Sequence, residues 1–487
     1  MKQLTLILTL SSVLTGCALF SPEYQQPAIA APSQTRTGVI FESNSTDFSQ
    51  LQWWKKFQNP LLNSLIIQAL KNNNELKMAQ GNILQAQAQL KSAEYAWIPT
   101  LSASGMGLAG NTYMTNMTPQ GSLARALPAG SVGNTNFNVW EGGFVPSYTF
   151  NVFANLNQTK LAQASLEMQQ AAFNATRLSI ISQVSGGYFM LLGQKQQLLL
   201  QRQLLADLDK LSQLQQLKIT VGTADQTNLK LLQQQYQDAN AKIPQIENSI
   251  AATENALKVL LGENPGKINS SEYLEHYDLN GIIPANLPSA ILKNRPDILL
   301  AEDNLKMANA NVGLANSVFF PTISLTGNIG GASVALSNLF SVGTGFWFMQ
   351  AAANMPILNA SSYEQIKAAK GGYYVAYYNY VQTIKAAFAD VDNSLTNQQK
   401  MDAAYAASKK SYQALAEYYH LIETKYRVGT ADKLTALNAR LLLDNSALNL
   451  NSAKMQQLNS IVGVYQSLAG GYAVNESSTA ITDITDN

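Results

Sequence analysis

The chain has 487 residues, of which 46% are hydrophobic and 13% are charged, and its formal net charge is +1. This charged fraction is about half of the quarter that is usual in soluble proteins. Without an excess of lysine and arginine the chain lacks a basic surface for phosphates, so we expect no nucleic-acid partner.

The N-terminus resembles an export signal of the bacterial lipoprotein type. A positively charged start and an apolar stretch over residues 4–13 precede the tetrapeptide Leu-Thr-Gly-Cys, which ends at Cys17. The resemblance implies a signal peptide over residues 1–16 and attachment of a diacylglycerol and an N-acyl chain, such as palmitate, to Cys17. No other cofactor is expected. Alanine at position 18 implies sorting to the outer membrane. The alternative is an ordinary secretory signal with a chance cysteine.

Residues 17–50 are rich in proline, serine, threonine and asparagine, which predicts an extended, lipidated tether. Two copies of one plan follow. The sequence Val-Gly-Thr-Ala-Asp occurs at residues 221–225 and returns at 428–432, 207 positions later. In addition, 12 of the 36 residues from 70 to 105 are identical to those 222 positions further on. We therefore divide the remaining chain into a first repeat (51–262), a linker (263–287), a second repeat (288–470) and a tail (471–487).

Each repeat begins with a helical pattern and then changes to period-two alternation. In the first repeat the helix is predicted to run through Leu65 to Trp97, and Pro99 ends it. Ten-residue strands with one apolar face, few charges and aromatic ends are typical of a membrane β-barrel. A membrane helix is excluded because the mature chain has no run of about 18 apolar residues. The strands are predicted at about residues 100–112, 139–153, 322–333 and 345–357.

Long helical patterns flank both Val-Gly-Thr-Ala-Asp segments, with apolar residues at every third or fourth position. Such spacing predicts amphipathic helices with coiled-coil seams. As one helix, residues 157–220 would be about 95 Å long, at roughly 1.5 Å per residue. Glycine allows the positive φ of a helix C-cap, and aspartate can cap the next helix. Each segment is thus predicted to be a tight turn between two antiparallel helices.

Two strands from each repeat make four, which is too few to close a barrel. An open sheet edge in lipid leaves unpaired backbone groups, so several subunits must pool their strands. The residues alone allow a dimer with eight strands, a trimer with twelve or a tetramer with sixteen.

The doubled order of helix, strands, long helix, turn and helix behind a lipobox resembles the TolC-like outer-membrane efflux factors. The resemblance covers about residues 51–471 and is strongest to the lipoprotein branch, the NodT- and OprM-like proteins. Local motifs carry it: Trp53-Trp54, Arg295-Pro296-Asp297, Phe320-Pro321-Thr322, Tyr426-Arg427-Val428-Gly429-Thr430 and Leu468-Ala469-Gly470-Gly471.

The resemblance implies a mainly α-helical fold with a β-barrel part. Three identical subunits would form a 12-stranded barrel in the outer membrane, continuous with a helical tunnel in the periplasm. Its partners would be outer-membrane lipid, a periplasmic adaptor protein and an inner-membrane pump. The implied function is the outer-membrane channel of a tripartite efflux system, which passively exports small toxic compounds or drugs. The alternatives are the outer-membrane duct of a type I protein secretion system and, more distantly, a trimeric surface structural protein or adhesin.

The resemblance also implies roles for two groups of residues. The turn residues Val221, Gly222, Thr223, Val428, Gly429 and Thr430 would dock the adaptor. A periplasmic gate would fall on Tyr426, Leu434, Thr435 and Asn438, with Asp225 and Asp432 as helix caps or added charges. Related proteins often have aspartate where this chain has Asn438, so we expect this constriction to be less cation-selective.

Nothing in the sequence indicates an enzyme or a metal site. His276 and His420 lie singly, without cysteine or acidic residues at ligand spacing. The segment from Gly105 to Gly110 fits the dinucleotide pattern GxGxxG, but no helix is predicted after it to hold a pyrophosphate. We therefore expect no catalytic residues.

Overall fold

The structure is a computed structural model that describes residues 23–27, 36, 41–42, 48–113, 134–270, 272, 274, 277, 287–288 and 294–473. The expected lipid attachment at Cys17 lies outside the described residues. The chain forms two compact units, which do not coincide with the two sequence repeats. Unit one comprises Met1–Gln25, Ala86–Leu166 and Leu305–Ala376, and unit two comprises Gln26–Gln85, Glu167–Asn304 and Tyr377–Asn487. Each repeat therefore contributes to both units.

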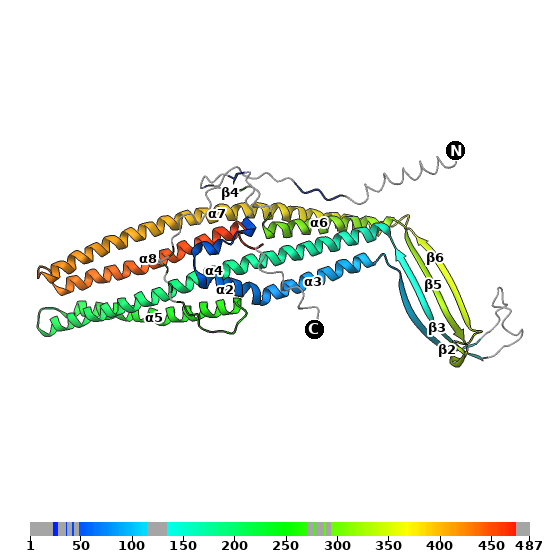
Figure 1. Cartoon of the computed structure of the whole chain (residues 1–487), viewed down its shortest axis with the longest axis horizontal. Helices are drawn as coiled ribbons and strands as arrows, with labels where there is room; N and C mark the ends of the chain where they lie inside the picture. The colour runs from blue at the N-terminus through cyan, green and yellow to red at the C-terminus, as the bar shows by residue number, and fades with distance from the viewer. Residues whose placement is uncertain are drawn as a thin grey trace. The chain divides into compact units, whose positions relative to one another are not determined.

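Unit one contains a four-stranded antiparallel sheet with the strand order β2-β3-β5-β6 (Figure 1). The first repeat supplies the hairpin β2–β3 and the second supplies β5–β6, and pairing of β3 with β5 joins them. Strands β2 and β6 are therefore the two edge strands of this sheet. The strands are β2 (Thr100–Tyr113), β3 (Asn134–Phe150), β5 (Thr322–Ser333) and β6 (Gly345–Asn354).

Strand β2 is one residue longer than predicted, and two other strands differ more from the prediction. Strand β3 was expected over 139–153, but it begins at Asn134 and ends at Phe150. It ends there because the side chain of Asn151 accepts a hydrogen bond from the Ala154 amide (3.0 Å) and caps the following helix. Strand β6 was expected to reach residue 357, but it ends at Asn354. Pro356 follows, which has no amide hydrogen for a sheet ladder.

The two faces of the sheet differ in polarity because successive side chains point to opposite sides. Register pairs Phe144 with Ile329, and Ile329 with Trp347. We call the side that carries these residues the apolar face; it also carries Tyr148, Ile323 and Leu325. The opposite side, the polar face, carries Glu141, Ser147, Thr149, Thr322, Ser324 and Asn328.

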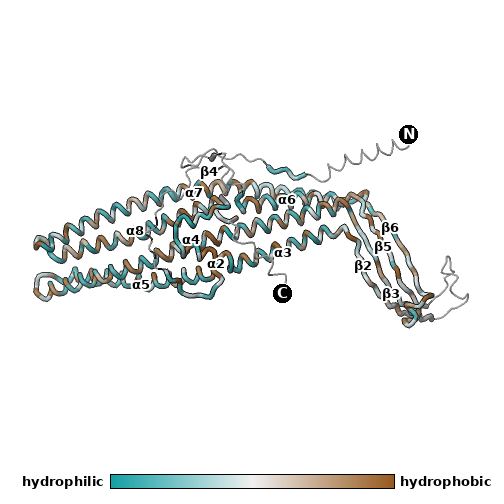
Figure 2. The backbone as a smooth tube through the Cα atoms, viewed as in Figure 1, coloured by the Kyte–Doolittle hydropathy of each residue, from teal (hydrophilic) through white to brown (hydrophobic). Residues whose placement is uncertain are grey.

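Seven α-helices account for most of the described residues. Helices α3, α4, α6 and α7 continue from one unit into the other, whereas α2, α5 and α8 lie in unit two. Figure 2 shows hydrophilic and hydrophobic residues mixed along the helices. Their bounds are α2 (Pro60–Asn72), α3 (Asn74–Tyr95), α4 (Val152–Thr220), α5 (Gln226–Leu260), α6 (Pro296–Asn316), α7 (Ala360–Arg427) and α8 (Lys433–Ser467).

The remaining elements are short. Strand β1 (Phe41–Glu42) pairs in parallel with β4 (Leu287–Pro288). The 3-10 helices are η2 (Phe48–Gln50), η3 (Trp53–Phe57), η7 (Ser317–Phe319) and η8 (Leu336–Asn338). Among the described residues, no helix is both long enough and apolar enough to cross a membrane.

The predicted single helix through Leu65 to Trp97 is wrong, because it is broken at Asn73 between α2 and α3. Asn73 has an extended backbone, with φ −60° and ψ 131°. Its side-chain oxygen accepts hydrogen bonds from the amides of Glu75 (2.8 Å) and Leu76 (3.2 Å). Asn73 thus starts a new helix in the manner of an N-cap.

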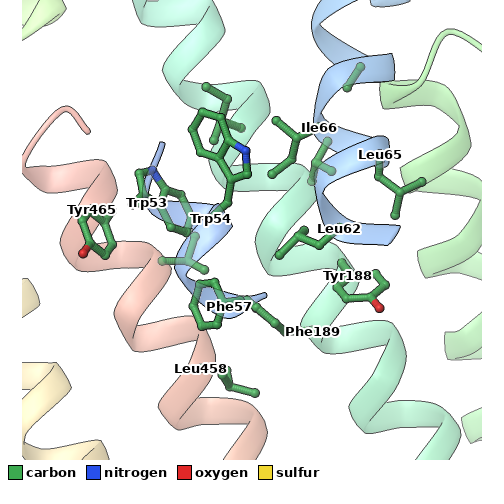
Figure 3. Packing of buried hydrophobic residues seen from close by; sticks show 14 of the residues in the cluster. Trp53, Trp54, Phe57, Leu62, Leu65, Ile66, Tyr188, Phe189, Leu458 and Tyr465 are labelled. Carbon is green, nitrogen blue, oxygen red and sulfur yellow. The ribbon is translucent and has the colours of Figure 1, made fainter. Parts of the chain in front are cut away.

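The main hydrophobic core of unit two joins the start of the first repeat to the end of the second (Figure 3). The ring of Trp53 stacks on Tyr465 of α8 with 4.9 Å between the ring centroids, and its indole nitrogen donates to the Gly470 carbonyl (3.2 Å). Trp54 lies against Gly471, whose φ of 85° suits glycine. Two motifs that are far apart in the sequence, Trp53-Trp54 and Gly470-Gly471, are therefore neighbours.

The motif Arg295-Pro296-Asp297 has a structural role at the start of α6. The buried guanidinium of Arg295 donates to both carboxylate oxygens of Asp297 (3.1 and 2.7 Å) and to Asp390 of α7 (3.2 Å). It also donates to the carbonyl of Ser467 at the end of α8. One buried cation thus fixes three helix positions, and its charge is balanced by two carboxylates.

Candidate functional site

The two Val-Gly-Thr-Ala-Asp segments have the predicted turn conformation. Gly222 has φ 75° and Gly429 has φ 82°, values at which a side chain would be strained. The glycine amides bond to the carbonyls of Ile219 (3.0 Å) and Tyr426 (3.1 Å), three residues earlier. These bonds, with those of the following threonines, form a Schellman motif at the end of α4 and of α7.

Threonine and aspartate complete both turns in the same way. The amides of Thr223 and Thr430 bond to the carbonyls of Lys218 (2.9 Å) and Lys425 (2.8 Å), and the threonine hydroxyls bond to the same carbonyls. The carboxylates then cap the next helices: Asp225 accepts from the Thr227 amide (2.9 Å) and Asp432 from the Thr435 amide (2.8 Å). The capping interpretation of both aspartates is therefore confirmed.

Valine and alanine are the turn residues whose side chains have no such role, and of the two only valine is exposed. Val221 is 64% exposed and Val428 is 69% exposed. An exposed apolar side chain at the same position of both turns is available for contact with another protein. That this surface docks an adaptor stays a prediction.

Next to the turns, an ion pair connects the two hairpins. The ammonium of Lys218, in the last turn of α4, lies 3.1 Å from Asp432, which caps α8. Hydrogen bonds from the hydroxyl and the amide of Thr435, and then the charge of Lys218, lower the pKa of Asp432 to about 2. Asp432 is thus ionised at any physiological pH and carries a fixed negative charge beside the turn.

The residues predicted to form a gate lie around the second turn. Tyr426 is on the last turn of α7 and is 41% exposed. Leu434, Thr435 and Asn438 are on the first turns of α8, where Leu434 and Asn438 share one helix face. Leu434 is half-buried, and Thr435 and Asn438 are exposed. Their exposure leaves them available to other copies of the chain, and their gate function stays a prediction.

Sequence reasoning missed a buried ionic network between α4 and α8. Asp207 of α4 accepts from Lys210 (2.7 Å) and lies 3.4 Å from Arg440 of α8. Arg440 also lies 3.2 Å from Asp444, which accepts from Gln203 at 3.3 Å. The only sequence signal was Asp444 as a polar interruption of an apolar seam. Gln203 and Asp207 are on α4, more than 200 residues away, so they leave no trace in the spacing of α8.

The two buried carboxyl groups of this network differ in their protonation. Burial raises the pKa of Asp444 to about 6, and neither Arg440 nor Gln203 fully offsets it. Burial also opposes ionisation of Asp207, but hydrogen bonds from Lys210 and Asp444 and the nearby cations outweigh it and lower its pKa. Asp207 therefore holds the negative charge, and Asp444 holds a proton in mildly acidic conditions.

In the part of the chain that the structure describes, no group of three or more histidine, cysteine, aspartate or glutamate side chains could hold a metal ion. His420 lies on α7, and His276 is not among the described residues.

An amphipathic sheet with one apolar face, combined with long helical hairpins that occur twice, defines the class of a membrane channel subunit with a strand part and a helical part. The chain also matches the family model described as "Outer membrane efflux protein" over residues 65–263 and 287–470. The chain belongs to this family of outer-membrane efflux channels, and its location is the outer membrane.

Individual relatives agree over nearly the whole chain. The toluene efflux pump outer membrane protein TtgC of Pseudomonas putida is 30% identical over 478 residues, which cover 97% of this chain and 96% of TtgC. The probable outer membrane lipoprotein SilC of Salmonella typhimurium is 28% identical over 467 residues, which cover 94% of this chain and 97% of SilC. The open-state MtrE outer membrane channel of Neisseria gonorrhoeae superimposes with a TM-score of 0.78 at 26% identity, over 93% of this chain and 98% of MtrE.

Proposed function

We propose that three copies of the chain form one outer-membrane duct, in which their sheets close into a barrel of twelve strands. The observation that carries this proposal is the four-stranded sheet, in which β2 and β6 are edge strands. In lipid, each unpaired backbone group at such an edge would cost several kcal/mol. If β2 of one copy pairs with β6 of the next, no strand of the barrel has an unpaired edge. The number three comes from the family resemblance.

The two turns are the proposed docking surface for a periplasmic adaptor, which connects the duct to an inner-membrane pump. Support comes from the exposed Val221 and Val428 and from the identical geometry of the two turns, which offers six similar contact points in a trimer. The duct itself is passive, because the pump supplies the energy, and no enzymatic activity is proposed. The proposed cargo is small toxic compounds, in keeping with TtgC, a relative named for toluene efflux.

In-cell photo-crosslinking tests the docking surface. A photoreactive residue replaces Val221 or Val428, which keeps the glycine, threonine and aspartate that shape each turn. The matched control is Tyr374, which is on the part of α7 that belongs to unit one and is 62% exposed. We expect capture of an adaptor protein from the two valines and not from Tyr374.

The identity of the captured protein decides between two kinds of cargo. An adaptor of an efflux pump supports export of small molecules, whereas an adaptor of an ATP-driven secretion system would replace this proposal with polypeptide export. Equal capture from Tyr374 would overturn the assignment of the turns.

A lipid anchor at Cys17 is part of the proposed function. It is supported by the lipobox and by SilC, a relative named as an outer membrane lipoprotein. Cells grown with labelled palmitate should label the wild-type chain and not a Cys17→Ser variant. Because Cys17 is the only cysteine, label that persists in this variant cannot be a thioether-linked lipid and would contradict the anchor.

A further inference from the structure

The connection between β5 and β6 folds back onto the apolar face of the sheet. We call residues 334–344, which include η8, the β5–β6 loop. A methyl group placed on Gly142 would lie 3.1 Å from a methyl carbon of Leu339 and 3.4 Å from the ring of Phe340. Gly142 is between Trp140 and Phe144 in β3, on the same side of the strand as both. The loop therefore covers part of the apolar face.

The loop has a defined shape that its own hydrogen bonds maintain. The hydroxyl of Thr344 lies within 2.9 to 3.0 Å of the carbonyl oxygens of Asn338, Leu339 and Ser341. The Thr344 amide donates to Ser341 (3.1 Å), and the Thr344 carbonyl accepts from Ala332 of β5 (3.0 Å). Leu339 is buried as a result, although it belongs to a connection between two strands.

A cavity of about 460 Å³ lies between the loop and strands β2 and β3. Binding sites for small ligands typically measure roughly 300 to 1,000 Å³. Glycines form its floor, since Gly105 pairs with Gly142, and Gly107 pairs with Trp140. A methyl group on Gly107 would overlap the Trp140 ring, whereas one on Gly105 would meet only a carbonyl oxygen at 3.9 Å. Its walls include Trp140, Phe144, Leu336, Leu339 and Phe340.

The cavity offers hydrocarbon and no charge to a ligand. The one acidic residue in its lining, Glu141, has its carboxylate on the polar face, where it accepts a hydrogen bond from Asn328 (2.6 Å). Three of the lining side chains are largely exposed: Phe144 is 58% exposed, Leu336 is 58% exposed and Phe340 is 81% exposed. In water, exposing so many apolar side chains together would be unfavourable.

We infer that this cavity binds an acyl chain of a lipid in the surrounding outer membrane. The inference rests on the membrane placement of the sheet, in which the apolar face contacts lipid. The cavity is on that face, across the sheet from the polar face, which lines the duct in the proposed barrel. A second copy of the chain would pair with the edge strands and leave this face uncovered. An unbranched hydrocarbon chain can lie along the glycine floor and needs no polar partner.

Photo-crosslinking to labelled lipid tests the inference in the full-length chain. A benzophenone residue is placed at Leu336, which lines the cavity, or at Val342, which is fully exposed on the same loop and does not line it. Outer-membrane vesicles are prepared from cells grown with radioactive phosphate. This label marks membrane lipids but not the acyl groups expected on Cys17. We expect several-fold more labelled lipid on the Leu336 probe, with the adduct on an acyl carbon.

Filling the cavity supplies the matched control. Gly105→Leu should reduce capture at Leu336 to the level of Val342, whereas Ala109→Leu, on the same strand and face but outside the lining, should leave it unchanged. Equal capture from the two probes, or capture at Leu336 that persists in Gly105→Leu, would overturn the inference. An adduct without phosphate would also overturn it, because the occupant would then be a free fatty acid. The comparison of the two probes decides the question even if Gly105→Leu does not insert.

Discussion

The two buried carboxyl groups that face each other between α4 and α8 make this part of the helical region sensitive to pH. Asp444 is buried beside Asp207, and one guanidinium, that of Arg440, serves both. Two carboxylates sharing so few cations cannot both ionise without cost, so one keeps its proton.

Replacing Asp444 with asparagine should remove a pH dependence of stability. From about pH 4 to about pH 6 the folded chain holds the Asp444 proton while the unfolded chain has lost it, so wild-type stability falls as pH rises through about 6. Asp444→Asn cannot ionise and should lose this decline, which is on the order of 2 kcal/mol. Asp207, with its lowered pKa, is ionised in both states across this window and adds no slope.

The thermal unfolding midpoint of wild type and variant in detergent, measured across this pH range, checks the prediction. Asp432→Asn is the matched control. The pKa of Asp432 in the folded chain is about 2, so its replacement should lower stability evenly across the same window. An unchanged slope in Asp444→Asn would show that Asp444 ionises normally.

At the scale of elements, each hairpin depends on one glycine. Gly222→Ala or Gly429→Ala forces a side chain into the left-handed region at φ 75° or 82° and should cost roughly 1–2 kcal/mol. Hydrogen exchange of the turn amides should accelerate by about 5- to 30-fold. Gly371→Ala should instead stabilise the chain by roughly 0.5–1 kcal/mol. Gly371 is inside α7 with open space around it, and alanine favours a helix there. Slower exchange in the turn variants would contradict the strain argument.

The sequence predicts best those elements whose cause is local. The turns follow from glycine and aspartate at fixed spacing, and the strand β5 follows from alternation between Ile323 and Leu325. Local reasoning is weaker at element ends. Asn72, Asn73 and Asn74 read as one polar stretch of a helix, and only the backbone shows that Asn73 stops one helix and caps the next.

Contacts between distant segments could not be predicted from one sequence. The pairing of Trp53 with Tyr465 and of Asp207 with Arg440 depends on how helices from the two repeats pack. The position of the β5–β6 loop is a similar case. Its apolar residues carry no periodicity, and only the packing of the loop against β3 shows that Leu339 lies over Gly142.

At the scale of the whole molecule, a substitution occurs three times in the proposed trimer, so the changed side chains form a ring. Asn438→Asp would place three carboxylates around the proposed gate and should raise the permeability of cations over anions. Bilayer recordings measure this ratio. Asn438→Gln, which adds length but no charge, should leave it near the wild-type value. If Asn438→Asp behaves like Asn438→Gln, the narrowest ring of the duct is elsewhere.

The self-contained hydrogen bonding of the turns has a consequence for the order of events in transport. Apart from the ion pair between Lys218 and Asp432, the hydrogen bonds that shape the first turn lie between Lys218 and Thr227, and those of the second lie between Lys425 and Thr435. Helices can therefore shift at their seams without altering the shape of either turn. A partner that recognises this shape meets the same surface whether the duct is shut or conducting. Binding of the partner to the turns can therefore come before the duct opens.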